Sequence, residues 1–173
     1  MNRIEFALTA DDLIAAQRLY QLAGIKRQAV WVVPILGFAL YLYTRLSGET
    51  DRLLLLIAML AMVFSRVLVP LYSRFFGIPR MARRAIADDP AMSELASLGW
   101  DDKAIWAESE TASWNQPMGD LKAWLADDRV LLLFRQVHLF HIIPARAFPD
   151  VATRQALIAA LDANGVSGTW PPR

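Results

Sequence analysis

The sequence predicts an α+β protein in which a two-span transmembrane helical hairpin carries a small antiparallel β domain with a C-terminal helix. Three observations predict this fold class. Two long apolar runs, Ala29–Tyr43 and Leu53–Tyr72, are joined by one short polar loop. Six short segments with strand-like patterns follow, ending at Ile143. The last periodic segment, Asp150–Ala163, has the apolar stripe of an amphipathic helix.

The two apolar runs predict helices that cross a membrane over about 28-46 and 53-72. A crossing helix needs about 20 mostly apolar residues. The second run supplies that length, whereas the first reaches it only with flanking residues. Membrane barrel strands would alternate apolar and polar residues, and these runs do not. A buried helix pair in a soluble core is the alternative, but neither run has the polar face that such helices usually keep.

Arg66 is the charged residue inside the second run. An arginine at the centre of a membrane costs about 2.5–3.5 kcal/mol on insertion scales. Because Arg66 lies toward one end of the run, its long side chain could reach the nearer surface and lower that cost. The other interpretation is an intramembrane charge that serves a transport path or a partner.

The charges on either side of the hairpin predict its topology. The nine-residue loop, Thr44–Arg52, places both termini on one side. Basic residues are in excess on that side, so the positive-inside rule predicts both termini in the cytoplasm and a location in the cytoplasmic (inner) membrane. The residues expected to contact anionic lipid headgroups at the interface are Lys26, Arg27, Arg74, Arg80, Arg83 and Arg84.

Composition narrows the function classes. The chain has no cysteine, so it can hold neither a disulfide framework nor a thiolate metal site. Residues 1–87 contain 11 basic and 5 acidic residues, whereas residues 88–173 contain 7 basic and 12 acidic residues. The net charge of the second half is therefore negative. An acidic domain is a poor match for phosphate backbones, which argues against nucleic acid as a partner.

The segments on either side of the hairpin are predicted to be short. Within residues 1-27 the pattern predicts a strand at Arg3–Leu8 followed by a helix. The helix is expected to start at the capping-box pattern of Thr9 and Asp12. The hairpin occupies 28-72, and residues 73-90 read as a basic juxtamembrane helix. The β domain with its closing helix is expected over 91-165, and residues 166-173 form a tail.

The strands of the β domain are predicted from alternation and turn residues. Arg129–Arg135 is a continuous apolar run, which is typical of a strand buried on both faces. Asp127 and Asp128 precede it and indicate a hairpin turn. The arrangement indicates a small antiparallel sheet or open barrel packed against the final helix. The expected strands are Glu94–Gly99, Ala104–Glu108, Thr111–Asn115, Leu121–Ala126, Arg129–Arg135 and Leu139–Ile143.

The order of elements and two short stretches resemble the YcxB-like membrane protein family over nearly the full length. The stretches are Leu131–Phe134, followed by Ile142–Phe148, and Pro117–Leu121. Met118 stands where the family usually has tryptophan, and Ala145 where lysine is common. The resemblance implies a cytoplasmic C-terminal domain similar to bacterial pleckstrin-homology (PH)-like modules. It implies no activity, because the family has no established one.

The sequence contains no recognisable catalytic constellation. His138 and His141 are the only histidines, and three-residue spacing on a strand directs them to opposite faces. We interpret them as ordinary surface or turn residues. The Asp pairs fall at expected caps and turns, and no phosphate-binding glycine loop is present. The sequence therefore predicts no catalytic residues, no metal site and no cofactor.

Three side chains are candidate partner contacts. Trp114 and Trp124 lie in predicted strands, where core filling competes with an aromatic patch on an exposed sheet face. Arg146 follows a strand, between Pro144 and Phe148. It could contact a lipid headgroup or a partner, or it could form a salt bridge or cap contact that positions the final helix.

These observations leave three functional hypotheses. The first is a non-enzymatic scaffold or protein-binding module, in which a tethered PH-like domain engages a partner protein or further copies of the chain. The second is a membrane-resident immunity or accessory factor against a membrane-acting toxin. The third is a subunit of an oligomeric transporter, for which Arg66 is the only sign.

Overall fold

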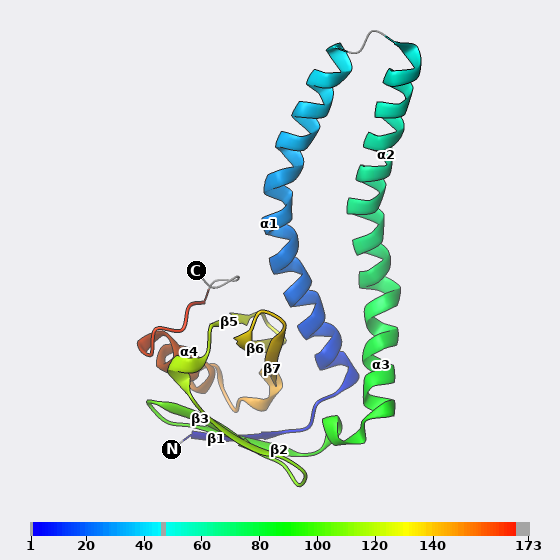
Figure 1. The fold of residues 1–173 in the computed structure, drawn as a ribbon. Coiled ribbons are helices and arrows are strands. Elements are labelled where there is room, and N and C mark those ends of the chain that lie inside the picture. Colours follow the sequence, from blue (N-terminus) through cyan, green and yellow to red (C-terminus); the bar gives the residue numbers. More distant parts are fainter. Residues whose placement is uncertain (1, 46–47, 169–173) are drawn as a thin grey trace.

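A computed structural model shows a β domain beside a long helical hairpin (Figure 1). The structure describes residues 2–45 and 48–168, apart from the side chains of 25–33, 35–36, 39, 63, 66–67, 70 and 90. The chain starts in the β domain, leaves it along the hairpin, and returns to complete the domain. The sheets lie on the side of the first hairpin helix that faces away from the second helix.

The hairpin consists of α1 (Ala10–Arg45) and α2 (Glu49–Tyr72). A π-helical turn at Ser73–Gly77 connects α2 to α3 (Ile78–Asp88). Helix α1 begins at the predicted capping box. The Asp12 carboxylate accepts hydrogen bonds from the Thr9 backbone N–H at 2.9 Å and from the Thr9 hydroxyl at 2.8 Å. These bonds satisfy donors that would be unpaired at a helix start.

The first sheet contains four antiparallel strands in the order β1-β2-β3-β4. These are β1 (Asn2–Phe6), β2 (Ala96–Trp100), β3 (Ala104–Glu108) and β4 (Ser113–Pro117). The N-terminal strand β1 therefore pairs with a strand that lies some 90 residues later, Ile4 being opposite Leu98. Ile4, Leu98 and Ile105 are buried on the inner face of this sheet.

The second sheet contains β5 (Ala123–Ala126), β6 (Val130–Gln136) and β7 (Leu139–Pro144) in that order. Its central strand β6 is buried on both faces, as the continuous apolar run predicted. Leu131 and Leu133 pack toward the first sheet. Val130, Leu132 and Phe134 pack toward Ala15 and Ala16 of α1, on the other face.

Helix α4 (Val151–Ala163) closes the core between the sheets. The Asp150 carboxylate caps it by accepting a hydrogen bond from the Thr153 backbone N–H at 2.6 Å. Leu157 and Leu161, four residues apart on one face, are fully buried in this core. The observed fold is thus α+β, with two antiparallel sheets and a C-terminal helix.

The prediction of a transmembrane hairpin is wrong. In the described part of the chain, no helix combines the length and the apolar character that a membrane crossing requires. The first half of α1 carries charged residues and packs on the β domain. The predicted spans at 28-46 and 53-72, the inner-membrane location and the placement of both termini in the cytoplasm are all corrected by this finding.

Gly99 on β2 gives a test of the first sheet. A Cβ at this position would lie 2.5 Å from the indole ring of Trp106, its neighbour on β3. We expect Gly99→Ala to destabilise the fold by about 1–3 kcal/mol, because the ring or the strand must shift. Urea denaturation measures the change. Gly119→Ala is the matched control, since its Cβ meets nothing within 4 Å. Equal stabilities of the two variants would contradict this packing.

Candidate functional site on the helical hairpin

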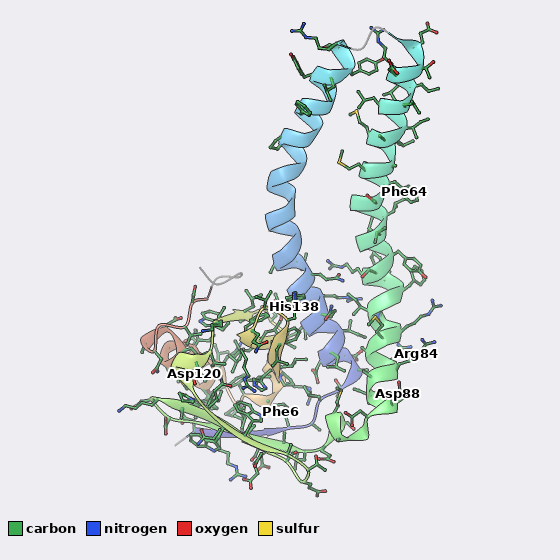
Figure 2. The ribbon with its side chains drawn as sticks, in the orientation of Figure 1. Phe6, Phe64, Arg84, Asp88, Asp120 and His138 are labelled. Carbon is green, nitrogen blue, oxygen red and sulfur yellow. The ribbon has the colours of Figure 1, made fainter. Side chains whose placement is uncertain are left out.

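Helix α2 presents two different faces. Leu55, Met59 and Met62 are half-buried and recur at helical spacing, so they define the face that lies toward α1. The opposite face has no neighbour within the described chain. Figure 2 shows Phe64 pointing from this second face, away from α1.

The outward face carries a continuous apolar stripe. Its members recur every three or four residues, which is the spacing of a helix-packing seam. Each is between 43% and 71% exposed, the most exposed being Leu60. At about 1.5 Å per residue the stripe extends over roughly 27 Å. We call these residues the α2 stripe: Leu53, Ile57, Leu60, Phe64, Leu68 and Leu71.

The lower half of the α2 stripe borders an apolar hollow of about 510 Å³. Tyr72 and Phe76 stack beside it, with ring centroids 5.5 Å apart. Both rings are more than half exposed. The hollow can accept bulky apolar side chains from another surface. Its lining consists of Phe64, Leu68, Val69, Leu71, Tyr72, Phe75 and Phe76.

The two ends of the α2 stripe carry opposite charges. Glu49 and Asp51 lie in the first turn of α2, and both are exposed. Arg74, also exposed, lies in the π-helical turn beyond the other end. The helix dipole has the opposite polarity, so each charge is placed at the end where it stabilises the helix. The α2 stripe therefore lies between Glu49 and Asp51, with Arg52 beside them, at one end and Arg74 at the other.

A second apolar groove, of about 320 Å³, lies at the base of the hairpin. Ala16 of α1, Ile78 and Met81 of α3, and Phe140 and Ile142 of β7 contribute to its lining. The Gln21 side-chain amide donates a hydrogen bond to the Ser73 hydroxyl at 3.0 Å near one end. This bond connects α1 to the π-helical turn at the edge of the groove.

Three of the basic residues predicted at a membrane interface share one face of α3, because they lie three and four positions apart. Arg80, Arg83 and Arg84 are exposed on α3, away from its buried residues Ile78 and Ala82. Figure 2 shows Arg84 pointing away from α1. The side chains of Lys26, Arg27 and Arg66 lie outside the described residues. The expectation that these basic residues contact lipid headgroups rested on the membrane location, which the structure does not support.

Arg146 joins the end of β7 to the start of α1. Its guanidinium donates hydrogen bonds to the Asp12 carboxylate at 2.6 Å and to the Ala7 carbonyl at 2.7 Å. Burial raises the pKa of Asp12, but the bonds from Arg146 and Thr9 outweigh burial and hold that pKa below its ordinary value. Arg146 thus forms a salt bridge, as one sequence interpretation expected, but it positions α1 rather than the final helix.

The two candidate tryptophans take part in internal contacts. Trp114 stacks on His141 with ring centroids 4.1 Å apart and an interplanar angle of 18°. The Trp124 indole N–H donates a hydrogen bond to the Asp162 carboxylate of α4 at 2.9 Å. His141 is therefore half-buried between the sheets, and the interpretation of it as an ordinary surface or turn residue is corrected. His138 does lie at a turn, where its Nδ1 is 2.9 Å from the Tyr20 hydroxyl.

Comparisons with known proteins and a search for metal clusters add no assignment. No protein family, no curated protein and no solved structure matches the chain. The resemblance to YcxB-like proteins and to PH-like modules therefore stays a prediction. Within residues 2–45 and 48–168, no three His, Asp or Glu side chains gather closely enough to hold a metal ion. Among the side chains that the structure describes, the α2 stripe is the longest apolar row without a neighbour, so it is the candidate functional site.

The Arg146–Asp12 ion pair has a testable dependence on pH. We expect Arg146→Met to lower the free energy of unfolding at pH 7 by about 1–3 kcal/mol, because the buried Asp12 carboxylate loses a donor. A lowered folded-state pKa contributes stability that is present above the unfolded pKa of about 3.9 and is lost as the pH falls through the folded pKa. The difference in the free energy of unfolding between wild type and variant should therefore become smaller as the pH falls from 5 to 2.5.

Urea denaturation across this pH range measures the difference. Arg129→Met is the control, because Arg129 is an exposed arginine that takes part in neither of the ion pairs found among the described residues. The difference in the free energy of unfolding between wild type and Arg146→Met could instead stay constant down to pH 2.5. That result would show that the ion pair does not stabilise the fold.

Proposed function

We propose that this protein is a non-enzymatic scaffold that assembles by antiparallel pairing of α2 with α2 of a second copy, and that thereby presents two β domains. The observation that carries the proposal is the α2 stripe, a continuous row of large apolar side chains that nothing in the described chain covers. Exposed apolar patches of this extent mark interaction sites in proteins.

The area of the surface supports a stable protein interface. The α2 stripe together with Leu54, Leu56, Val69 and Tyr72 comprises ten large side chains that are about half exposed. A whole aromatic side chain buries about 150–250 Å², and a leucine somewhat less. The set therefore offers on the order of 1,000 Å² per chain, compared with about 800 Å² per partner in a standard interface.

The distribution of residues along α2 favours a second copy, in antiparallel orientation. When two α2 helices cross midway between Leu60 and Phe64, each Leu60 faces Phe64 of the second copy. The same arrangement places Leu53 opposite Leu71 of the second copy. The acidic end at Glu49 then lies beside Arg74 of the second copy, twice by symmetry. A parallel pair would instead bring like charges together at both ends.

The β domain does not obstruct this pairing. It contacts α1 through β5, β6 and β7, on the side of α1 that faces away from α2 (Figure 1). Phe64 of the α2 stripe points in the other direction, away from α1 (Figure 2). Two copies can therefore join along α2 and hold their β domains apart at opposite ends of a four-helix assembly.

Cysteine cross-linking tests the orientation, because the chain has no cysteine of its own. Two differently tagged chains, Leu53→Cys and Leu71→Cys, are co-expressed and oxidised. We expect a disulfide between the two variants, since antiparallel pairing brings these positions within the Cα separation of about 4.4–6.8 Å that a disulfide needs. Electrophoresis without reductant measures the cross-linked fraction.

Each single variant expressed alone is the first control. In an antiparallel pair, two copies of position 53 lie roughly 27 Å apart and cannot be bridged. Glu110→Cys, exposed in the turn between β3 and β4, is the second control for random collision. Cross-linking of Leu53→Cys with itself would support a parallel pair, and no cross-link above the Glu110→Cys background would overturn the proposal.

Charge reversal at the two ends gives an independent test. Glu49→Arg alone and Arg74→Glu alone each place like charges together in the antiparallel pair. Each should weaken the dimer roughly 5–30-fold, since exposed pairs contribute up to about 1 kcal/mol each and form twice. The double variant should recover affinity, because opposite charges are restored. Sedimentation equilibrium measures the dissociation constants, and a double variant weaker than both single variants would contradict the arrangement.

A further inference from the structure

A polar pocket of about 340 Å³ opens where the two sheets separate. Strand β4 contributes one wall, and the end of β6 contributes the other. A 3₁₀ turn at Met118–Asp120 follows β4, and Asp120 of this turn (labelled in Figure 2) contributes to the lining. The lining residues are Trp114, Asn115, Gln116, Pro117, Asp120, Arg135 and Gln136.

Gln116 is the buried polar residue of this pocket. Its side chain faces inward from β4, opposite Ile105, and the residue is only 8% exposed. Its Oε1 atom is buried and has no hydrogen-bond partner. A buried acceptor without a donor is costly, and native proteins rarely leave one unpaired. The acceptor lies beneath the pocket surface, so a bound molecule would meet the charged groups of the lining rather than this atom.

The pocket also contains one cation and one anion that are not paired with each other. Arg135 extends from the end of β6 and Asp120 from the turn after β4. Within the described residues, the ion pairs closer than 4 Å are Arg3–Glu5 and Arg146–Asp12, so neither pocket charge is neutralised by a protein partner. A ligand with a single negative charge could pair with Arg135 but would meet Asp120 as well.

Trp114 and His141 form a rigid apolar wall behind these groups. The two rings are stacked, and the Nε2 atom of His141 is buried without a partner. Burial, with a smaller contribution from Arg135, lowers the pKa of His141 to about 4. His141 is therefore neutral at physiological pH, and Arg135 supplies the positive charge of the pocket.

We propose that this pocket binds a free α-amino acid in its zwitterionic form. The carboxylate pairs with the Arg135 guanidinium, which matches carboxylate geometry with two parallel hydrogen bonds. The ammonium donates to the Asp120 carboxylate. The side chain of the ligand lies against Trp114. A zwitterion fits because it meets one positive group and one negative group at once.

The pocket size and charge are less suited to other classes of small molecule. A nucleotide carries several negative charges, whereas the pocket has one arginine and one carboxylate. Its volume lies at the lower end of the range for small-molecule sites, about 300–1,000 Å³. Free amino acids combine small size with the charge pattern that the lining presents.

Thermal unfolding of the full chain with each of the twenty common amino acids tests the proposal. A ligand that binds only the folded state at a hundred times its Kd should raise the Tm by roughly 5–10 °C. For L-leucine the matched probes are 4-methylpentanoate, which lacks the ammonium, and 3-methylbutylamine, which lacks the carboxylate. We expect at least one amino acid to raise the Tm, and neither matched probe of that amino acid to do so.

Three outcomes would overturn the proposal. The first is no Tm shift with any of the twenty amino acids. The second is an equal shift with the carboxylate probe alone, which would show a simple anion site. The third is a shift with the amine probe alone, which would show a cation site at Asp120.

Variants locate the binding within the pocket. Arg135→Gln and Asp120→Asn should each weaken the Kd of the amino acid at least tenfold by titration calorimetry, because each removes one charge partner. Arg129→Gln, at the other end of the β5–β6 hairpin, should leave the Kd unchanged. The Tm without ligand shows whether each variant folds. Unchanged affinity in a folded Arg135→Gln variant would contradict the assignment.

Discussion

The burial of β6 on both faces is the constraint on which the rest of the structure depends. Val130–Phe134 is completely inaccessible to water, so both faces of the second sheet must be covered. The first sheet and α4 cover one face, and α1 covers the other. One apolar strand thereby places a helix from the start of the chain and a sheet assembled from both ends of the sequence. The β domain cannot be completed without α1, and the base of α1 is held by the domain.

The Arg146–Asp12 ion pair adds directional hydrogen bonds to this apolar packing. Apolar contact between α1 and β6 would tolerate some sliding, because dispersion and burial are not directional. The Arg146 guanidinium binds both the Asp12 carboxylate and the Ala7 carbonyl, which fixes the point where β1 turns into α1. The same carboxylate forms the capping box with Thr9. A single buried group therefore sets the helix start, the helix position and the connection to the first sheet.

The hairpin beyond this base is built differently from the domain. Helix α2 has half-buried residues toward α1, but its outward residues, such as Leu60 and Phe64, remain exposed. A single chain leaves the second face of this helix pair exposed, and this is the face on which we propose that a second copy packs. The polar pocket beside Gln116 is the converse case, in which buried polar groups lack partners within the described chain. The two features point to different occupants, a second copy for the stripe and a small zwitterion for the pocket.

The sequence by itself determined the local elements of this protein. The start of α1 at Thr9, the strands from Ala104 to Ile143 and the cap of α4 at Asp150 follow from capping residues, turn residues and apolar periodicity, which act over a few residues. Only the tertiary structure decided what surrounds them. An apolar run such as Leu53–Tyr72 has the same composition in a membrane, a core or an interface, and local pattern cannot distinguish these. Likewise, Trp114, Gln116 and Arg135 meet because two sheets pack together, which no spacing along the chain encodes.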